Sequence, residues 1–348
     1  MSIVIVGTFL PASQIGGVTN HCTRLARRLE AMKKKAVCIN ISARRKAFID
    51  LCIRFFSRPN GSDVFHFHTS SANIPFLVFS LIIYLLRVNV AVSFHSGALV
   101  ERAEKSISFR LSLLYAGLIS QRVVVMNEEQ ALRLRKLMPL IARKILSISS
   151  FVFPVKPDVG SYAFNRKEYR ISAMGAWLRY YRFEETLYAI EALCDRLPHA
   201  QVSAHFAVAL FSIDEAYRDY VLTESRLLMS RNEKIRIRFT EDVREPLLHI
   251  AESDVFIRNS SVDSYGLCVA EAIFMGRPSI ATNVCRRAAG AYLYSPGDIH
   301  VLVNHLESIY RGLDTATLPE VSIERSEDAF HGILDMYDSM ERVCVNVV

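Results

Sequence analysis

Residues 253–298 read SDVFIRNSSVDSYGLCVAEAIFMGRPSIATNVCRRAAGAYLYSPGD and contain the pattern that repeats along the chain. Apolar runs predict a buried strand over Asp254–Ile257 and a second strand from Ser279 to Ala281. Between them, a polar loop containing Asp263 leads into a helix expected over Leu267–Phe274. A strand, a helix and a strand in this order indicate parallel strands covered by helices.

The same alternation runs through the rest of the chain. A first cycle has a strand at Ile3–Val6, a glycine-bearing loop at Gly7–Gly17 and an amphipathic helix at Val18–Met32. A second cycle starts with the strand Ile171–Met174, and the proline-bearing segment Phe151–Asp158 before it predicts a linker. We therefore expect an α/β fold of two Rossmann-like, doubly wound parallel-sheet domains, with the ligand in an interdomain cleft between the carboxyl ends of both sheets.

The domain boundaries are expected at this linker and near the end of the chain. The N-terminal domain should cover residues 1–155 and the C-terminal domain residues 156–325. A final helix over residues 326–348 should pack back toward the N-terminal domain. A chain of 348 residues is long enough for two buried cores.

Cysteine and histidine usage indicates a reducing compartment. The seven cysteines include no Cys-x-x-Cys pair, and no histidines cluster at ligand spacing, which argues against a disulfide framework or a structural zinc site. The N-terminus begins with a strand rather than a secretion signal, so we expect a cytoplasmic protein. The absence of a P-loop and of Gly-x-Gly-x-x-Gly disfavours a dehydrogenase.

Charge is unevenly distributed between the two halves. Residues 1–160 hold 22 Lys and Arg against 8 Asp and Glu, whereas the remainder hold 20 against 27. A basic half can bind nucleic acid, anionic lipid or a phosphorylated substrate, or it can form ordinary solvated helix surfaces. No nucleic-acid-binding motif accompanies the clusters, so we expect an anionic membrane surface rather than nucleic acid. The basic clusters are Arg24, Arg27 and Arg28, Lys33–Lys35, Arg44–Lys46, and Arg133, Arg135, Lys136, Arg143 and Lys144.

The apolar run Ile74–Leu86 raises the question of a membrane span. Its 13 residues would extend about 20 Å as a helix, which is shorter than the roughly 30 Å of a bilayer core. We expect a helix inside a soluble domain, with a shallow interfacial helix as the alternative.

The segment from Asp263 to Glu271 is the strongest candidate for a functional site. The first-turn N–H groups of a helix that begins at Leu267 have no intrahelical partners and suit a diphosphate. Asp263 precedes this helix and Glu271 lies within it, so one carboxylate can reach a sugar and the other a ribose diol. The alternative is a surface helix with a chance pair of acids.

This segment resembles glycosyltransferase family 4, a large retaining family with the two-domain GT-B fold. The family motif reads roughly Glu-x-Phe-Gly-Leu-x-x-x-Glu-Ala-x-x-x-Gly-x-Pro-Val-x-Ala. The chain has Asp263-Ser-Tyr-Gly-Leu-Cys-Val-Ala-Glu271-Ala, followed by Gly276, Pro278 and Ala281. The match is confined to residues 253–298, and the rest of the chain matches only in layout.

The first acid of the motif is Asp263 rather than Glu, a departure shared by members associated with O-antigen and capsular polysaccharide assembly. Two flanking segments, Arg258-Asn-Ser-Ser-Val-Asp263 and Cys285-Arg-Arg-Ala-Ala-Gly290, also resemble those members. The resemblance implies that Glu271 binds the ribose hydroxyls of the donor and that Asp263 faces the transferred sugar. The backbone of Gly266 and Leu267 would then meet the diphosphate.

The resemblance is weaker at the family's cationic loop. Family members carry a strand ending in Gly-Arg and, about five residues later, Lys-Gly, and these cations hold the diphosphate. Here Ala176 stands at the first cation position, so Arg179 and Arg182 are the candidates for the leaving diphosphate. The alternative is that both are solvated loop arginines.

The resemblance extends to three places in the N-terminal domain. Gly16 and Gly17 are similar to the family's Gly-Gly loop over the donor phosphate, where glycine permits close backbone approach. His95 ends a predicted strand where the family often has a histidine facing the donor sugar, with a buried, satisfied imidazole as the alternative. His66 and His68 are expected on opposite faces of their strand, with His68 either lining the acceptor cleft or, as we favour, structural.

Together these implications define an expected function. The chain would be a retaining hexosyltransferase with Asp263, Glu271 and His95 as catalytic residues and a nucleotide sugar as donor. It would act on a lipid-linked glycan acceptor in surface polysaccharide or lipopolysaccharide biosynthesis, peripherally bound at the inner face of the cell membrane. No metal is expected, because the chain has no Asp-x-Asp and arginines can replace the cation. The alternatives are a nucleotide-sugar epimerase of the same fold and a non-catalytic sugar-nucleotide-binding subunit.

Overall fold

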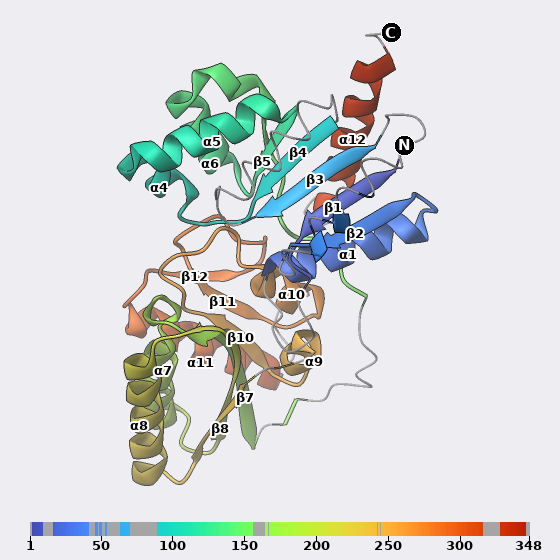
Figure 1. The fold of residues 1–348 in the computed structure, drawn as a ribbon. Helices are drawn as coiled ribbons and strands as arrows, with labels where there is room; N and C mark the ends of the chain where they lie inside the picture. The colour runs from blue at the N-terminus through green and yellow to red at the C-terminus, as the bar shows by residue number, and fades with distance from the viewer. Residues whose placement is uncertain are drawn as a thin grey trace. The chain divides into compact units, whose positions relative to one another are not determined.

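The computed structural model describes residues 2–9, 17–41, 46–47, 49–50, 53, 63–69, 89–155, 164–165, 167–241, 243, 245–315 and 328–345. The chain forms two compact units, each built on its own parallel sheet (Figure 1). Unit 1 combines Met1–Leu10, Gly16–Phe153 and Ser326–Val348, and unit 2 combines Pro11–Ile15 with Pro154–Arg325. The expected α/β fold with two doubly wound parallel sheets is confirmed.

The sheet of unit 1 has six parallel strands in the order β2-β1-β3-β4-β5-β6. Its central strands are rich in β-branched and aromatic residues and are buried along almost their whole length, as parallel strands covered on both faces must be. The strands are β1 (Ile3–Gly7), β2 (Ala36–Asn40), β3 (Val64–Thr69), β4 (Asn89–Phe94), β5 (Arg122–Val125) and β6 (Ile145–Ser147).

Helices cover both faces of this sheet (Figure 1). Leu25 and Tyr337, from the first and last helices of the unit, share one apolar cluster with Ile5 of β1. The other cluster lies around Phe65 and Val92 and contains side chains of the four helices between β4 and β6, the 3-10 helix included. The helices are α1 (Gly17–Ala31), α4 (Leu99–Lys105), α5 (Ile107–Ile119), α6 (Glu128–Leu137), the 3-10 helix η2 (Pro139–Lys144) and α12 (Ala329–Val345).

Unit 2 also has six parallel strands, in the order β12-β11-β10-β7-β8-β9. The strands are β7 (Glu168–Trp177), β8 (Gln201–Ile213), β9 (Ile235–Glu241), β10 (Val255–Arg258), β11 (Ser279–Thr282) and β12 (Tyr292–Tyr294). The helices are the 3-10 helix η3 (Arg179–Tyr181), α7 (Phe183–Arg196), α8 (Glu215–Arg231), α9 (Pro246–Ala251), α10 (Leu267–Phe274) and α11 (Ile299–Thr315). Helices α7, α8 and α11 contribute to the large apolar core of this unit, and α10 contacts β10 and β11.

Strand order places a switch point in each sheet. In unit 2 the chain runs outward from β7 to β9 and then returns to the other side of β7 as β10, and in unit 1 it makes the same reversal between β1 and β3. Ligands of open parallel sheets bind beside such switch points, outside the carboxyl ends of the strands. The loop that follows β10 is therefore the first place to look for a site in unit 2.

The local predictions around this loop are close to the observed elements. Helix α10 spans the expected residues Leu267–Phe274, and β10 is shifted by one residue from the expected strand. In the described part of the chain, no helix has the length and apolar character needed to cross a membrane. The apolar run Ile74–Leu86 lies outside the described residues.

Candidate functional site

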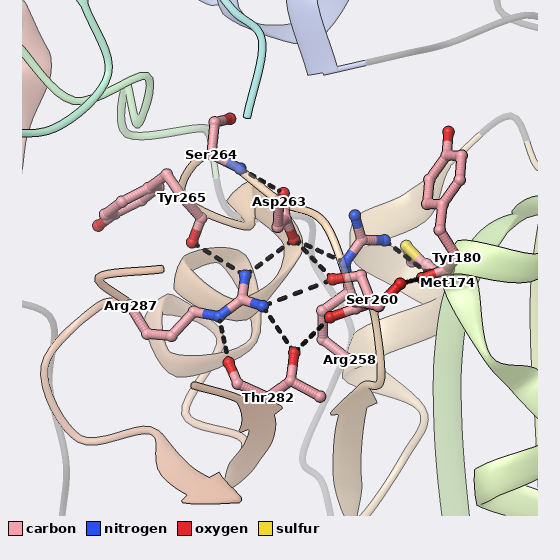
Figure 2. Close-up of polar contacts among 10 residues, drawn as sticks. Met174, Tyr180, Arg258, Ser260, Asp263, Ser264, Tyr265, Thr282 and Arg287 are labelled. Carbon is pink, nitrogen blue, oxygen red and sulfur yellow. Dashed lines mark hydrogen bonds and ion pairs between the residues drawn. The ribbon is translucent and has the colours of Figure 1, made fainter. Parts of the chain in front are cut away.

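Asp263 is held in the loop between β10 and α10 by two arginines. Its Oδ2 atom accepts hydrogen bonds from Arg258 Nε at 3.0 Å, from Arg287 Nη1 at 2.8 Å and from Ser260 Oγ at 3.0 Å (Figure 2). Its Oδ1 atom accepts one from the Ser264 N–H at 3.0 Å. We call Arg258, Asp263 and Arg287 the Asp263 clamp.

The arginines of the Asp263 clamp are buried and carry further bonds. Arg287, with a side chain only 1 % exposed, also donates to the Thr282 carbonyl at 2.9 Å and to the Tyr265 carbonyl at 3.3 Å. Arg258 donates to the Met174 carbonyl of β7 at 2.9 Å. Burial alone would raise the pKa of Asp263, but the charges of the two arginines hold that pKa well below its usual range. The carboxylate therefore stays ionised and the loop shape is fixed by charge.

Gly266 links the Asp263 clamp to helix α10. Its φ of 78° is left-handed, a conformation that favours glycine, and a Cβ at this position would clash with Arg287 Nη1. Helix α10 begins at the next residue, Leu267, so its first-turn N–H groups lie directly after the loop. The predicted backbone site at Gly266 and Leu267 is therefore a rigid turn at a helix N-terminus, which is suited to an anion.

Glu271 lies on α10 with 2 % of its surface exposed. Cys268 lies one turn earlier on α10. Burial is the main cause that raises the pKa of its thiol to about 11, and the charges of Asp263 and Glu271 also raise it. Asp263 therefore lies in the loop before α10, and Glu271 lies within this helix. The separate roles of Asp263 toward the sugar and of Glu271 toward the ribose stay predictions.

The two candidate arginines of the β7–α7 loop are in different surroundings. Arg179 has a 70 % exposed side chain that pairs with Asp214, with Nε and Oδ2 3.3 Å apart. Arg182 is one-third exposed, precedes α7 with a left-handed φ of 49°, and pairs with the buried Glu185. The carbonyl of Arg182 also accepts a hydrogen bond from Asn259 Nδ2 at 3.1 Å, which ties it to the residue after β10. Arg182 is therefore joined to the candidate loop, whereas Arg179 lies out on the surface.

A polar network extends the site toward β12. Glu185 accepts from the Gly297 N–H at 2.7 Å, and the hydroxyl of Tyr294 lies 2.8 Å from Glu185 Oε2 and 2.7 Å from Asn259 Oδ1. Burial and the charge of Glu185 raise the pKa of Tyr294 well above its usual range, so its hydroxyl keeps its proton. These contacts connect Arg182 to the loop after β10, because Arg182 pairs with Glu185 and the Tyr294 hydroxyl bridges Glu185 and Asn259.

In unit 1, the predicted residues are placed at the carboxyl edge of the sheet. Gly17 is the first residue of α1, and Gly16 lies outside the described residues. His95 follows β4 and its Nε2 lies 3.0 Å from His68 Nδ1. The expectation that His66 and His68 face opposite sides is wrong, because side chains two apart on a strand share one face, and their ring centroids are 4.0 Å apart. His66 is a satisfied core histidine, 2.7 Å from both the Tyr337 hydroxyl and Ser93 Oγ.

Sequence reasoning missed two features of these sites. Arg287 stands inside the quoted segment Cys285–Gly290, but its ion pair with Asp263 joins residues 24 positions apart and depends on tertiary structure. His21 lies on α1, and only the fold brings it beside His68 and His95.

Comparisons with solved structures identify the fold. A trehalose-6-phosphate synthase structure, titled as an insight into enzymatic glycosyltransfer with retention through bisubstrate glycomimetics, matches with a TM-score of 0.66 at 11 % identity, covering 98 % of this chain and 99 % of that one. An E. coli structure titled as bound with UDP-2-fluoro glucose matches with a TM-score of 0.64 at 10 % identity over 98 % and 99 % of the two chains. Sucrose-phosphate synthase from Thermosynechococcus elongatus matches with a TM-score of 0.61 at 13 % identity over 100 % and 98 %.

These likenesses establish the class of fold. The chain has the GT-B fold of two parallel-sheet α/β domains, as expected, and at these identities the likeness shows the fold alone. No protein-family model matches the sequence, and no curated protein matches it either. The closer resemblance to glycosyltransferase family 4 therefore stays a prediction that rests on residues 253–298.

Proposed function

We propose that this protein is a retaining hexosyltransferase that uses a nucleotide sugar as donor. The observation that carries the proposal is the turn in unit 2 where the Asp263 clamp, the left-handed Gly266 and the start of α10 follow one another at the sheet's switch point. This turn offers helix N–H groups to a diphosphate and places Glu271 within the same helix. The GT-B fold of glycosyltransferases in the comparisons supports this assignment.

Each residue of the turn would contact a different part of the donor. The first-turn N–H groups of α10 would bind the diphosphate, and Glu271 would accept hydrogen bonds from the ribose hydroxyls. Asp263 would meet the transferred sugar through Oδ1, because Oδ2 already accepts three hydrogen bonds. The clamp would thus hold this carboxylate ionised and in position while leaving one oxygen for substrate.

Arg182 is the better candidate for stabilising the leaving nucleoside diphosphate. It is tied to the residue after β10 and remains one-third exposed, whereas Arg258 and Arg287 already neutralise Asp263. A fixed cation beside developing negative charge lowers the barrier without reorganisation during the reaction. Arg179, paired with Asp214 at the surface, would take no part.

Retention follows from how such a site would hold the donor. A leaving phosphate oxygen would accept the acceptor hydroxyl's proton on the same face of the sugar on which the new bond forms. No separate base would then be needed, in keeping with a sequence that offers no obvious one. The trehalose-6-phosphate synthase comparison, whose title concerns transfer with retention, supports this choice.

We place the acceptor on a membrane as a lipid-linked glycan, with the enzyme bound peripherally at the cytoplasmic face. The support is the resemblance to O-antigen members and the basic character of the N-terminal half. Several of its cations pair internally: Arg28 with Asp328, Arg133 with Glu104 and Arg135 with Glu128. The members of the expected clusters that the structure shows as exposed are Arg27, Lys33, Lys35, Lys46, Lys136 and Arg143.

A nucleotide-sugar screen tests the proposal. A matching donor at 100 times its Kd should stabilise the protein by about 2.7 kcal/mol, seen as a rise in Tm. With an acceptor extract, the same donor should give a glycosylated product, and Glu271→Gln should lose it. If the donor is converted only to free sugar and nucleotide, or to an epimer, an epimerase of this fold becomes the better assignment. If no nucleotide sugar raises Tm, the donor site is refuted.

A further inference from the structure

Three histidines from three elements of unit 1 meet at the carboxyl edge of its sheet. His21 lies on α1, His68 near the end of β3 and His95 directly after β4. One ring nitrogen of each lies within 4.8 Å of the other two, and the ring centroids are 4.8 to 5.3 Å apart. The group sits beside the switch point between β1 and β3, where open parallel sheets place their ligands.

The three imidazoles are largely shielded from water. His21 is 2 % exposed and His68 is 1 % exposed, while His95 has intermediate exposure. A neutral imidazole has one lone pair, so each ring offers a nitrogen that can accept a proton or bind a cation.

Hydrogen bonding leaves nitrogens of this group without partners. His21 Nδ1 lies 2.7 Å from the Ser150 carbonyl, which can only accept, so Nδ1 carries the proton and Nε2 carries the lone pair. Among the described residues, nothing bonds to His21 Nε2 or to His68 Nε2, although both are buried. A ring N–H donated to a backbone carbonyl while the other nitrogen stays open is the usual arrangement of a metal-binding histidine.

The rings are also close enough to share an ion. His68 Nδ1 and His95 Nε2 lie 3.0 Å apart and share a hydrogen bond, so one of the two carries a proton, and a metal ion held at either nitrogen would take the place of this bond. Magnesium and calcium prefer oxygen ligands, which these three side chains do not supply.

We propose that His21, His68 and His95 form a binding site for a divalent transition metal ion, with Zn²⁺ as the best match to three neutral imidazoles. Water would complete the coordination, as in other three-histidine zinc sites. The ion would tie α1 to the ends of β3 and β4. His95 would then bind the metal ion instead of making the predicted contact with the donor sugar. The sequence shows no metal-ligand spacing because the ligands come from three separate elements.

Metal titration of the full chain tests this site. Metal-free protein is titrated with Zn²⁺ by calorimetry and with Co²⁺ by visible absorption, and we expect one ion per chain with the strong bands of four-coordinate Co²⁺. His21→Ala and His68→Ala should each weaken binding at least a hundredfold. The matched control is His249→Gln, a buried histidine of unit 2 beside His205, which should bind as the wild type does.

The result that overturns the proposal does not depend on the alanine variants folding. Wild-type protein that shows no saturable one-to-one Zn²⁺ binding refutes the site by itself. Circular dichroism checks the variants, and if one fails to fold, His95→Asn replaces it, because His95 is less buried than the other two. Zn²⁺ affinity in a folded variant within threefold of wild type also refutes the site. Nucleotide-sugar binding by metal-free protein tests the donor site of unit 2 separately.

Discussion

Replacing Arg287 with methionine should break the Asp263 clamp and destabilise unit 2. The substitution keeps an unbranched apolar stem but removes the guanidinium that lies 2.8 Å from Asp263 Oδ2. Asp263 would keep Arg258 as its ion-pair partner, while the carbonyls of Thr282 and Tyr265 would each lose a buried donor. Removing one partner of a buried ion pair costs about 3–5 kcal/mol when the other charge is left uncompensated, and because Arg258 stays beside Asp263 we expect the lower end of this range, which is still a large part of the 5–15 kcal/mol of a typical domain.

The assay can follow unit 2 alone. Trp177 is the single tryptophan of the chain and is buried in the core of unit 2, so its fluorescence during urea unfolding reports that unit. A matched control is Arg311→Met on α11, whose 67 % exposed side chain pairs with Glu307 four residues earlier. That exposed pair should contribute less than about 1 kcal/mol.

Two outcomes would refute the reasoning. A Trp177 transition for Arg287→Met within about 1 kcal/mol of wild type would show that the clamp contributes little. The double variant Arg287→Met, Asp263→Asn should be less destabilised than the sum of its single variants, because residues that form one ion pair are coupled. Strict additivity would show that Arg287 acts independently of Asp263.

Three further predictions concern the site and its chemistry. Glu271→Gln should lower turnover about a hundredfold or more with the Trp177 transition kept, through loss of a charge-assisted contact, and a wild-type rate would remove Glu271 from the mechanism. The folded-state pKa of Asp263 is depressed below its unfolded value of about 3.9. The stabilisation that its charge contributes is therefore present above that pH and should fall as the pH drops below it. Between pH 5 and pH 3, the free energy of urea unfolding should decrease less in Asp263→Asn than in wild type. Transfer should need no added Mg²⁺ or Mn²⁺ and should retain the donor's anomeric configuration, and a product NMR spectrum showing inversion would contradict the assignment.

The fold and the helix that carries the candidate site could be predicted because their signals are local. Apolar runs and helical spacing within Ser253–Asp298 were enough to place α10 at its observed residues. The two-residue period of a strand is also a local signal. It places His66 and His68 on one face, contrary to our expectation, because they stand two residues apart. Local patterns therefore locate α10 at its observed residues and β10 to within one residue.

Contacts between distant residues could not be predicted in this way. In the proposed metal site, His21 lies 47 positions before His68 and His95 lies 27 positions after it, so no spacing rule joins the three histidines. Likewise, nothing in the run around Arg287 states that its guanidinium would reach Asp263. Such pairings depend on parallel strands whose carboxyl ends meet at one edge of a sheet.

The Asp263 clamp also gives a physical reason for the motif's departure from Glu at its first acid. The carboxylate of Asp263 fits between Arg258, Arg287 and Ser260 with its side chain only 11 % exposed. A glutamate would add one methylene to a packed loop, and such overpacking typically costs about 1–3 kcal/mol. It would also move the carboxylate oxygens away from the two guanidiniums and leave Arg287, 1 % exposed, with an unpaired charge. The aspartate and the two arginines are therefore coupled, and we expect them to change together in any protein that shares this loop.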